Sequence, residues 1–147
     1  MSDLRELYQQ VILDHNQKPR NFRKIADANR TAEGYNRLCG DRITVDVTVE
    51  DGIVKDVAFQ GAGCAISRAA ASMMTASVMG KPEREVHALF QRVHAMLTGE
   101  SGAAAEVGKL AVFAGVREFP SRIKCATLAW HTLQAALHGA AEPVSTE

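Results

Sequence analysis

A strict alternation of apolar and polar residues marks the segment from Arg42 to Glu50. One face of this segment carries Ile43, Val45, Val47 and Val49, and the other carries Thr44, Asp46 and Thr48. Because successive side chains of a strand point to opposite faces, the pattern predicts a half-buried β-strand. Asp51-Gly52 supplies a turn, and Ile53 to Gln60 returns as a second strand. A short strand near Thr31 to Tyr35 can pair beside them.

Apolar residues recur at helical spacing in the segments that flank this sheet. The expected helices cover Asp3 to His15, Cys64 to Met79, a segment that begins at Pro82 and reaches Leu97, Ala103 to Phe113, and Arg122 to His138. Residues 1–139 are expected to form a single domain, and residues 140–147 a flexible tail. The chain is therefore predicted to be an α+β domain, a small antiparallel sheet with helices covering one face.

Charge and length exclude several classes of protein. The 147 residues contain 17 lysines and arginines and 17 aspartates and glutamates, so the formal net charge is zero. A general nucleic-acid-binding protein carries a basic surface, and this balance does not predict one. The longest stretch without a charged side chain has 17 residues, 125–141, whereas a membrane span needs about 20 apolar residues. The amino terminus has no apolar signal core, so we expect a soluble, cytoplasmic domain with no nucleic-acid or membrane partner.

Three cysteines lie far apart in the sequence, at Cys39, Cys64 and Cys125. An odd number of widely spaced cysteines without a secretion signal does not indicate a disulfide framework. Three interpretations remain open at this point: inert buried thiols, one reactive thiol, or a metal site gathered from distant segments.

The first cysteine belongs to Cys39-Gly40-Asp41, just before the first strand. Side chains two apart in an extended segment point the same way, so the thiol and the carboxylate can reach one centre. Gly40 leaves room for a metal ion or a reactant to approach the backbone. The alternative is a loop cysteine beside a surface aspartate.

The other two cysteines lie near predicted helix starts. Cys64 follows Gly61-Ala62-Gly63, and free N–H groups with the positive end of the helix dipole stabilise a thiolate there. Cys125 lies close to the start of the last helix, with Arg122 and Lys124 nearby. Three thiols and one carboxylate would complete a tetrahedral zinc site. No tight ligand pair anchors such a site, so buried cysteines that pack like alanine remain the alternative.

Three motifs in order resemble the SufU branch of the U-type iron–sulfur cluster assembly proteins, the SufU/IscU (NifU N-terminal-like) family. The motifs are Leu-Cys-Gly-Asp-Arg-Ile at 38–43, Gly-Ala-Gly-Cys-Ala-Ile-Ser at 61–67, and Arg-Ile-Lys-Cys-Ala-Thr-Leu-Ala-Trp at 122–130. Asp-His at 14–15 and Pro-Arg-Asn at 19–21 also match the family. The resemblance covers most of the chain, with residues 98–115 and the tail as its weak parts.

The resemblance implies a fold and a set of roles. The fold would be a three-stranded antiparallel sheet covered by helices, of the SufE/NifU-like kind. Four residues match the family's zinc ligands, and they are Cys39, Asp41, Cys64 and Cys125. Cys39 would also accept sulfur from a partner cysteine desulfurase of the SufS type, and Arg122 would lie near that site. A downstream scaffold of the SufB/C/D type would be a further partner.

The resemblance also separates two roles within the family. The IscU branch carries a histidine before its last cysteine, where this chain has Lys124, and a Leu-Pro-Pro-Val-Lys run that residues 119–124 do not repeat. Departures from the SufU pattern are Arg37 in place of a proline and Ala70 in place of a serine. The comparison favours a zinc-dependent sulfur relay, in effect a sulfurtransferase that stimulates its desulfurase. The alternatives are a scaffold or carrier of a transient [2Fe–2S] cluster or iron, and an interaction domain with a purely structural zinc.

Overall fold

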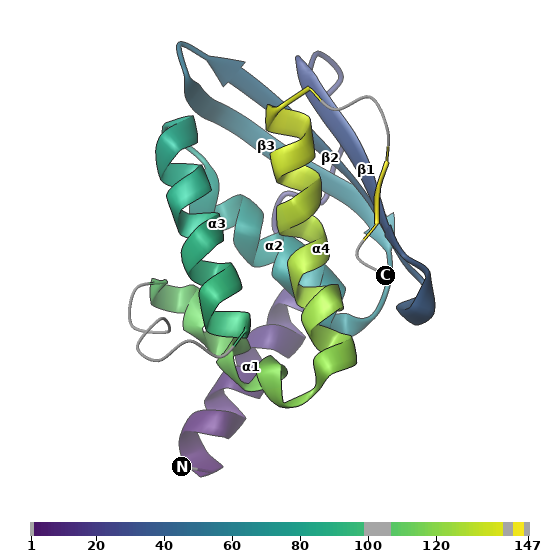
Figure 1. The fold of residues 1–147 in the computed structure, drawn as a ribbon, viewed down its shortest axis with the longest axis vertical. Coiled ribbons are helices and arrows are strands. Elements are labelled where there is room, and N and C mark those ends of the chain that lie inside the picture. The colour runs from purple at the N-terminus through teal and green to yellow at the C-terminus, as the bar shows by residue number, and fades with distance from the viewer. Residues whose placement is uncertain (1, 99–106, 140–142, 146–147) are drawn as a thin grey trace.

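The computed structural model describes residues 2–98, 107–139 and 143–145. Figure 1 shows the fold as a sheet covered by helices. Its elements in chain order are α1 (Ser2–Gln17), β1 (Arg30–Asn36), η1 (Arg37–Cys39), β2 (Asp41–Glu50), β3 (Ile53–Ala62), α2 (Ala65–Val78), α3 (Glu83–Leu97), η3 (Gly108–Glu118), α4 (Pro120–Leu137) and β4 (Val144–Ser145). The predicted α+β class is confirmed.

The sheet differs from the expected three antiparallel strands. It has four strands in the order β3-β2-β1-β4, and β4 runs parallel to β1, pairing Val144 with Gly34 and Ser145 with Tyr35. Two residues carry no detectable alternation, so the sequence could not reveal a strand within the predicted tail. They pair with the backbone of β1 at the edge that β2 leaves open. Residues 140–142 and 146–147 of the predicted tail lie outside the described residues.

The apolar face of the two long strands is buried as predicted. Val45 and Val47 of β2 and Val57 of β3 have no exposed surface. The opposite face is more protected than the alternation indicates, because Asp46 is only 8% exposed. Its carboxylate accepts hydrogen bonds from the N–H of Ile25 (3.1 Å) and the hydroxyl of Thr31 (2.8 Å), so it is buried but paired.

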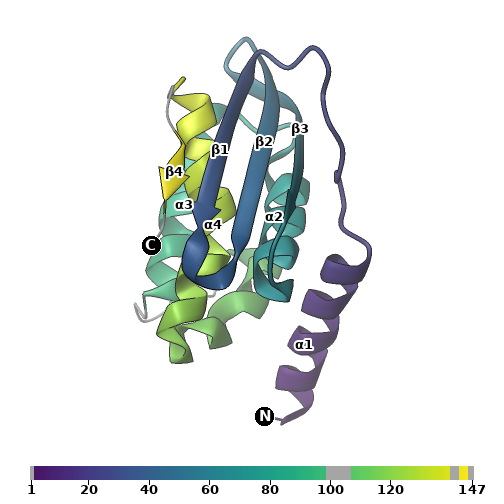
Figure 2. The ribbon, with the colours of Figure 1, turned by 90° about the vertical axis from the view of Figure 1, so that its right-hand side faces the viewer.

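The helices α2, α3 and α4 lie on one face of the sheet, and α1 packs against α2 (Figures 1 and 2). Their bounds lie within two residues of the predicted ones. The exception is the helix expected at 103–113: residues 103–106 lie outside the described residues, and the described part is a 3₁₀ helix that extends to Glu118. Among the described residues, no helix is long and apolar enough to cross a membrane.

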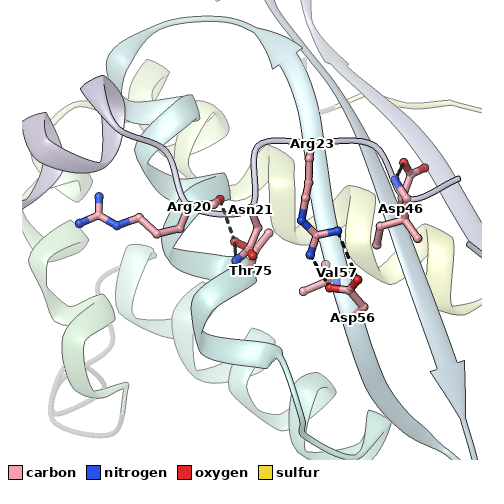
Figure 3. A network of polar contacts seen from close by, with 8 residues as sticks. Arg20, Asn21, Arg23, Asp46, Asp56, Val57 and Thr75 are labelled. Atoms are coloured by element: carbon pink, nitrogen blue, oxygen red, sulfur yellow. Dashed lines mark hydrogen bonds and ion pairs between the residues drawn. The ribbon is translucent and has the colours of Figure 1, made fainter.

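The segment between α1 and β1 covers the outer edge of β3 (Figure 2). Phe22 forms a parallel bridge with Phe59, whose carbonyl accepts from the N–H of Arg23 (3.1 Å) and whose N–H donates to the carbonyl of Asn21 (3.0 Å). The Arg23 guanidinium forms an ion pair with Asp56 at 2.6 Å (Figure 3). These contacts occupy a sheet edge that would otherwise present unpaired backbone groups.

A buried hydroxyl fastens this segment and α1 to α2. Ser72 has no exposed surface, and its Oγ accepts the backbone N–H of Arg20 at 2.8 Å. The same Oγ lies 2.7 Å from Nδ1 of His15 at the end of α1. Burial lowers the pKa of His15 and so favours its neutral ring. The Ser72 hydroxyl of α2 therefore provides a hydrogen-bond partner both for a side chain of α1 and for the backbone of the segment that follows α1.

We expect Ser72→Ala to lower the free energy of unfolding by about 1–3 kcal/mol, because it leaves the Arg20 N–H and the His15 ring without their partner. Ser77→Ala is the matched control, since the Ser77 hydroxyl bonds only to the carbonyl of Met73 in its own helix among the contacts described. That variant should change stability by less than about 0.5 kcal/mol. Urea unfolding measures both, and equal effects would contradict the role given to Ser72.

Candidate metal centre

Three separate segments of the chain meet at one end of the sheet. Cys39 ends η1, and Asp41 is the first residue of β2. Cys64 follows β3 and caps the start of α2, while Cys125 lies on α4. Figure 2 shows the β1–β2 connection at the lower end of the sheet. Residues that are up to 86 positions apart in sequence are thus brought to one place.

Three of the four donor atoms form one group, and the fourth, Sγ of Cys64, lies beside Asp41. Sγ of Cys39, a carboxylate oxygen of Asp41 and Sγ of Cys125 all lie within 4.8 Å of one another. Sγ of Cys64 lies 3.9 Å from Oδ2 of Asp41, whose Oδ1 accepts the backbone N–H of Cys64 at 2.9 Å. A tetrahedral zinc site with Zn–S bonds of ~2.3 Å places its sulfur ligands about 3.8 Å apart. Cys39, Asp41 and Cys125 therefore form a three-donor group that could hold a metal ion. Cys64 is not part of that group, so its Sγ would have to move closer to the other sulfurs to complete a four-ligand zinc site.

Two glycines shape this site in different ways. Gly40 has a φ of 70°, the left-handed conformation in which its N–H closes η1 on the carbonyl of Arg37. A side chain at Gly40 would meet no protein atom within 4 Å, so among the protein contacts it is the left-handed conformation that favours glycine there. Close approach is provided by Gly63, where a Cβ would lie 2.6 Å from Oδ1 of Asp41. The sequence analysis did not single out Gly63, and room for an ion or a reactant at Gly40 stays a prediction.

Cys64 occupies the helix start that the sequence predicted. Its Sγ accepts the backbone N–H of Ser67 at 3.4 Å, in the manner of an N-cap side chain. The sulfur is thus held between the free N–H groups of α2 and the carboxylate of Asp41. In this position the sulfur accepts one of the free N–H groups at the start of α2, and the thiol faces the carboxylate of Asp41.

Cys125 lies in a different place on its helix from the one predicted. Because α4 begins at Pro120, Cys125 falls in the second turn, away from the free N–H groups of the helix start. The side chain has no exposed surface, and its thiol lies 3.8 Å from the carbonyl of Ser121. Burial, followed by hydrogen bonding with Cys39, raises the pKa of Cys125. The thiol form is therefore favoured until a cation displaces its proton.

The cluster has a buried half and an accessible half. Asp41 is 2% exposed and Cys125 is fully buried, whereas Cys39 and Cys64 are partly exposed. Arg122 is exposed, and its Nη1 lies 4.0 Å from Sγ of Cys39. A hydrogen bond with Cys125, and the negative charge of the thiolates nearby, raise the pKa of Arg122. A guanidinium thus stands at the accessible rim, beside the thiol that a partner protein could reach.

One residue of the site escaped the sequence analysis. Asn36 is fully buried, lies opposite Asp41 in the β1–β2 ladder, and directs Nδ2 at Sγ of Cys125 over 3.6 Å. The sequence did contain a signal for it. Extending the predicted strand to residue 36 places Asn36 on the same inward face as Ala32, and a polar residue on a core face calls for a partner.

We expect the three thiols of the metal-free protein to differ in reactivity. Iodoacetamide should modify Cys39 at least about tenfold faster than Cys125, because burial hinders access to Cys125 and disfavours its thiolate. Peptide mass spectrometry over a time course measures both rates, and the urea-unfolded chain, in which the rates should converge, is the control. Equal rates in the folded protein would contradict the burial of Cys125.

Comparison with known proteins identifies the family. Residues 7–140 match the model of the NifU-like N terminal domain. The chain is 36% identical over 137 residues to the iron–sulfur cluster assembly scaffold protein IscU of Thermotoga maritima, covering 93% of this chain and 96% of that protein. It is 38% identical over 134 residues to the zinc-dependent sulfurtransferase SufU of Bacillus subtilis, covering 90% of each.

A solved structure agrees with these relatives. The crystal structure assigned as an iron–sulfur cluster assembly scaffold protein for the SUF system from Fervidobacterium islandicum AW-1 is similar with a TM-score of 0.84 and 32% identity. The similarity covers 90% of this chain and 97% of that one, so it extends over most of the chain. The resemblance that the three cysteine motifs indicate is confirmed, and the chain belongs to the SufU/IscU family of NifU-like N-terminal domains.

Proposed function

We propose that this protein is a zinc-dependent sulfur relay, which takes persulfide sulfur from a cysteine desulfurase for iron–sulfur cluster assembly. The observation that carries the proposal is the asymmetry of the cluster. Cys39 is a partly exposed thiol beside the guanidinium of Arg122, whereas Cys125 and Asp41 are buried beneath it. An acceptor thiol has to be reached by a partner, and Cys39 at the rim meets that requirement.

The residues proposed to hold zinc are Cys39, Asp41, Cys64 and Cys125. Their chemistry fits the ion, since zinc takes thiolate and carboxylate ligands in tetrahedral sites. When bound, zinc supplies a redox-inert positive charge that keeps thiols deprotonated without oxidising them. The buried pair, Cys125 and Asp41, would anchor the ion, and Cys39 would be the ligand that can exchange.

The sulfur transfer is a thiol exchange. The Cys39 thiolate attacks the outer sulfur of the desulfurase persulfide, a new S–S bond forms at Cys39, and the desulfurase cysteine leaves as a thiolate. One persulfide is consumed and one is formed, so no oxidant or reductant is needed. Arg122 would balance the negative charge at the rim. The sulfur would then pass to an assembly scaffold of the SufB/C/D type, with a SufS-type enzyme as its source.

A second candidate function is a carrier of a transient [2Fe–2S] cluster. The observation that favours it is the name of the Thermotoga maritima relative, an iron–sulfur cluster assembly scaffold protein. Cysteine thiolates also bind iron–sulfur clusters, so the donor set suits both functions. Lys124 stands immediately before Cys125, where the scaffold branch that the chain resembles has a histidine, and this supports the relay.

We expect Cys39→Ala to retain most of its zinc and to lose stimulation of a cysteine desulfurase by roughly tenfold or more, because three ligands remain while the acceptor is gone. Cys125→Ala is the comparison: it removes the buried anchor, so zinc content and melting temperature should fall together. Turnover assays, metal analysis and thermal melts provide the readouts. Normal stimulation by Cys39→Ala would refute the acceptor role.

The metal content separates the relay from the carrier. Protein purified without oxygen from iron-replete cells should be colourless, with about one zinc per chain, because the proposed site accommodates a single ion. A brown protein with iron and sulfide in equal amounts would instead establish the carrier. Metal analysis and a visible spectrum are sufficient, and aerobic purification of the same batch shows whether oxygen has destroyed a cluster.

A further inference from the structure

The side chain of Asn36 has no role in the fold that the described contacts reveal. It is fully buried at the end of β1, where it precedes η1, yet it makes no side-chain capping bond there. Its Oδ1 has no hydrogen-bond partner among the described residues. A buried amide with an unsatisfied oxygen destabilises a protein relative to an apolar side chain of similar shape. Folding alone therefore does not explain an asparagine at this position.

The one polar contact described for the Asn36 side chain is directed at the cluster. Its Nδ2 lies 3.6 Å from Sγ of Cys125, on the buried side of the site. Asn36 also lies directly opposite Asp41 in the ladder, so β1 and β2 together hold the amide beside the site. An amide N–H can only donate, and a sulfur with a full negative charge is the better acceptor. The contact is thus stronger for the thiolate that ligates a metal than for the thiol.

We propose that Asn36 is a positioning residue of the metal centre, which holds Cys125 on the ion through an N–H···S hydrogen bond. The inference rests on the metal site of the proposed function and adds a residue outside the four ligands. Partners of this kind orient a ligand and tune its binding to the metal. Ser121 offers Cys125 only a carbonyl oxygen, which cannot donate to a thiolate. Asn36 thereby makes Cys125 the permanent ligand, in contrast to Cys39 at the rim.

The test compares Asn36→Leu, which keeps the branching at Cγ but has no donor, with the wild-type chain. We expect zinc affinity, measured by competition with a chromophoric chelator, to fall about 10- to 100-fold. In the cobalt-substituted protein the sulfur-to-cobalt charge-transfer band should move to longer wavelength, because a sulfur without its N–H donor gives up electrons more easily. The metal-free melting temperature should be equal to or higher than that of the wild type, since the unsatisfied oxygen is gone.

A second variant and a control keep the test decisive. Asn36→Ala covers the case in which leucine is too large for the site, and it should show the same loss of affinity and the same spectral shift. Thr132→Val is the control, because Thr132 is equally buried and its hydroxyl bonds to the carbonyl of Leu128 within α4. It should leave the affinity and the cobalt spectrum unchanged.

The outcomes distinguish this inference from the proposed function. Wild-type affinity and spectrum in both Asn36 variants would overturn the role of Asn36 while leaving the zinc site intact. A loss of affinity that only follows a lower metal-free melting temperature would assign Asn36 a structural role and also overturn it. If the wild-type chain binds neither zinc nor cobalt, the proposed function itself fails.

Discussion

The buried carboxylate of Asp41 is the constraint on which this end of the structure depends. A carboxylate that is 2% exposed is unfavourable unless hydrogen bonds or a cation compensate its charge. The backbone N–H of Cys64 provides one such bond, and the approach is close enough that residue 63 has to be glycine. The hydrogen bond to Asp41 therefore holds the start of α2 against the start of β2. As a result, Cys64 lies beside the connection that carries Cys39.

The same packing divides the cluster into parts with different chemistry. The side chain of Cys125 lies on α4 and has no exposed surface, and this burial disfavours its thiolate in the absence of a cation. Cys39 lies at the end of a short 3₁₀ turn, partly exposed and beside Arg122. The proposed relay needs one ligand that stays and one that exchanges, and these two environments would suit them. The fold thus supplies the asymmetry on which the proposal rests.

Much of the scaffold could be predicted from local patterns. The alternation of β2 and β3 and the apolar spacing of the helices depend on residues close together in the chain, so the sequence alone located those elements to within two residues. The cysteine motifs identified the family because each is a short contiguous stretch. The two-residue strand β4 and the burial of Asp46 depend on contacts with distant segments, and no local pattern records them.

The sequence by itself determined which side chains are available to the site, namely three thiols, one carboxylate and a nearby arginine, and which local elements carry most of them. Cys39 is the exception, because it was expected in an extended segment and instead ends a 3₁₀ helix. Only the tertiary structure decided that the donor atoms of Cys39, Asp41 and Cys125 converge. It also decided that Cys125 is buried in the second turn of its helix and that Asn36 faces it from β1. The reason is physical. Periodicity reports which face of an element is buried, whereas the distance between two elements is set by the packing of the whole core between them.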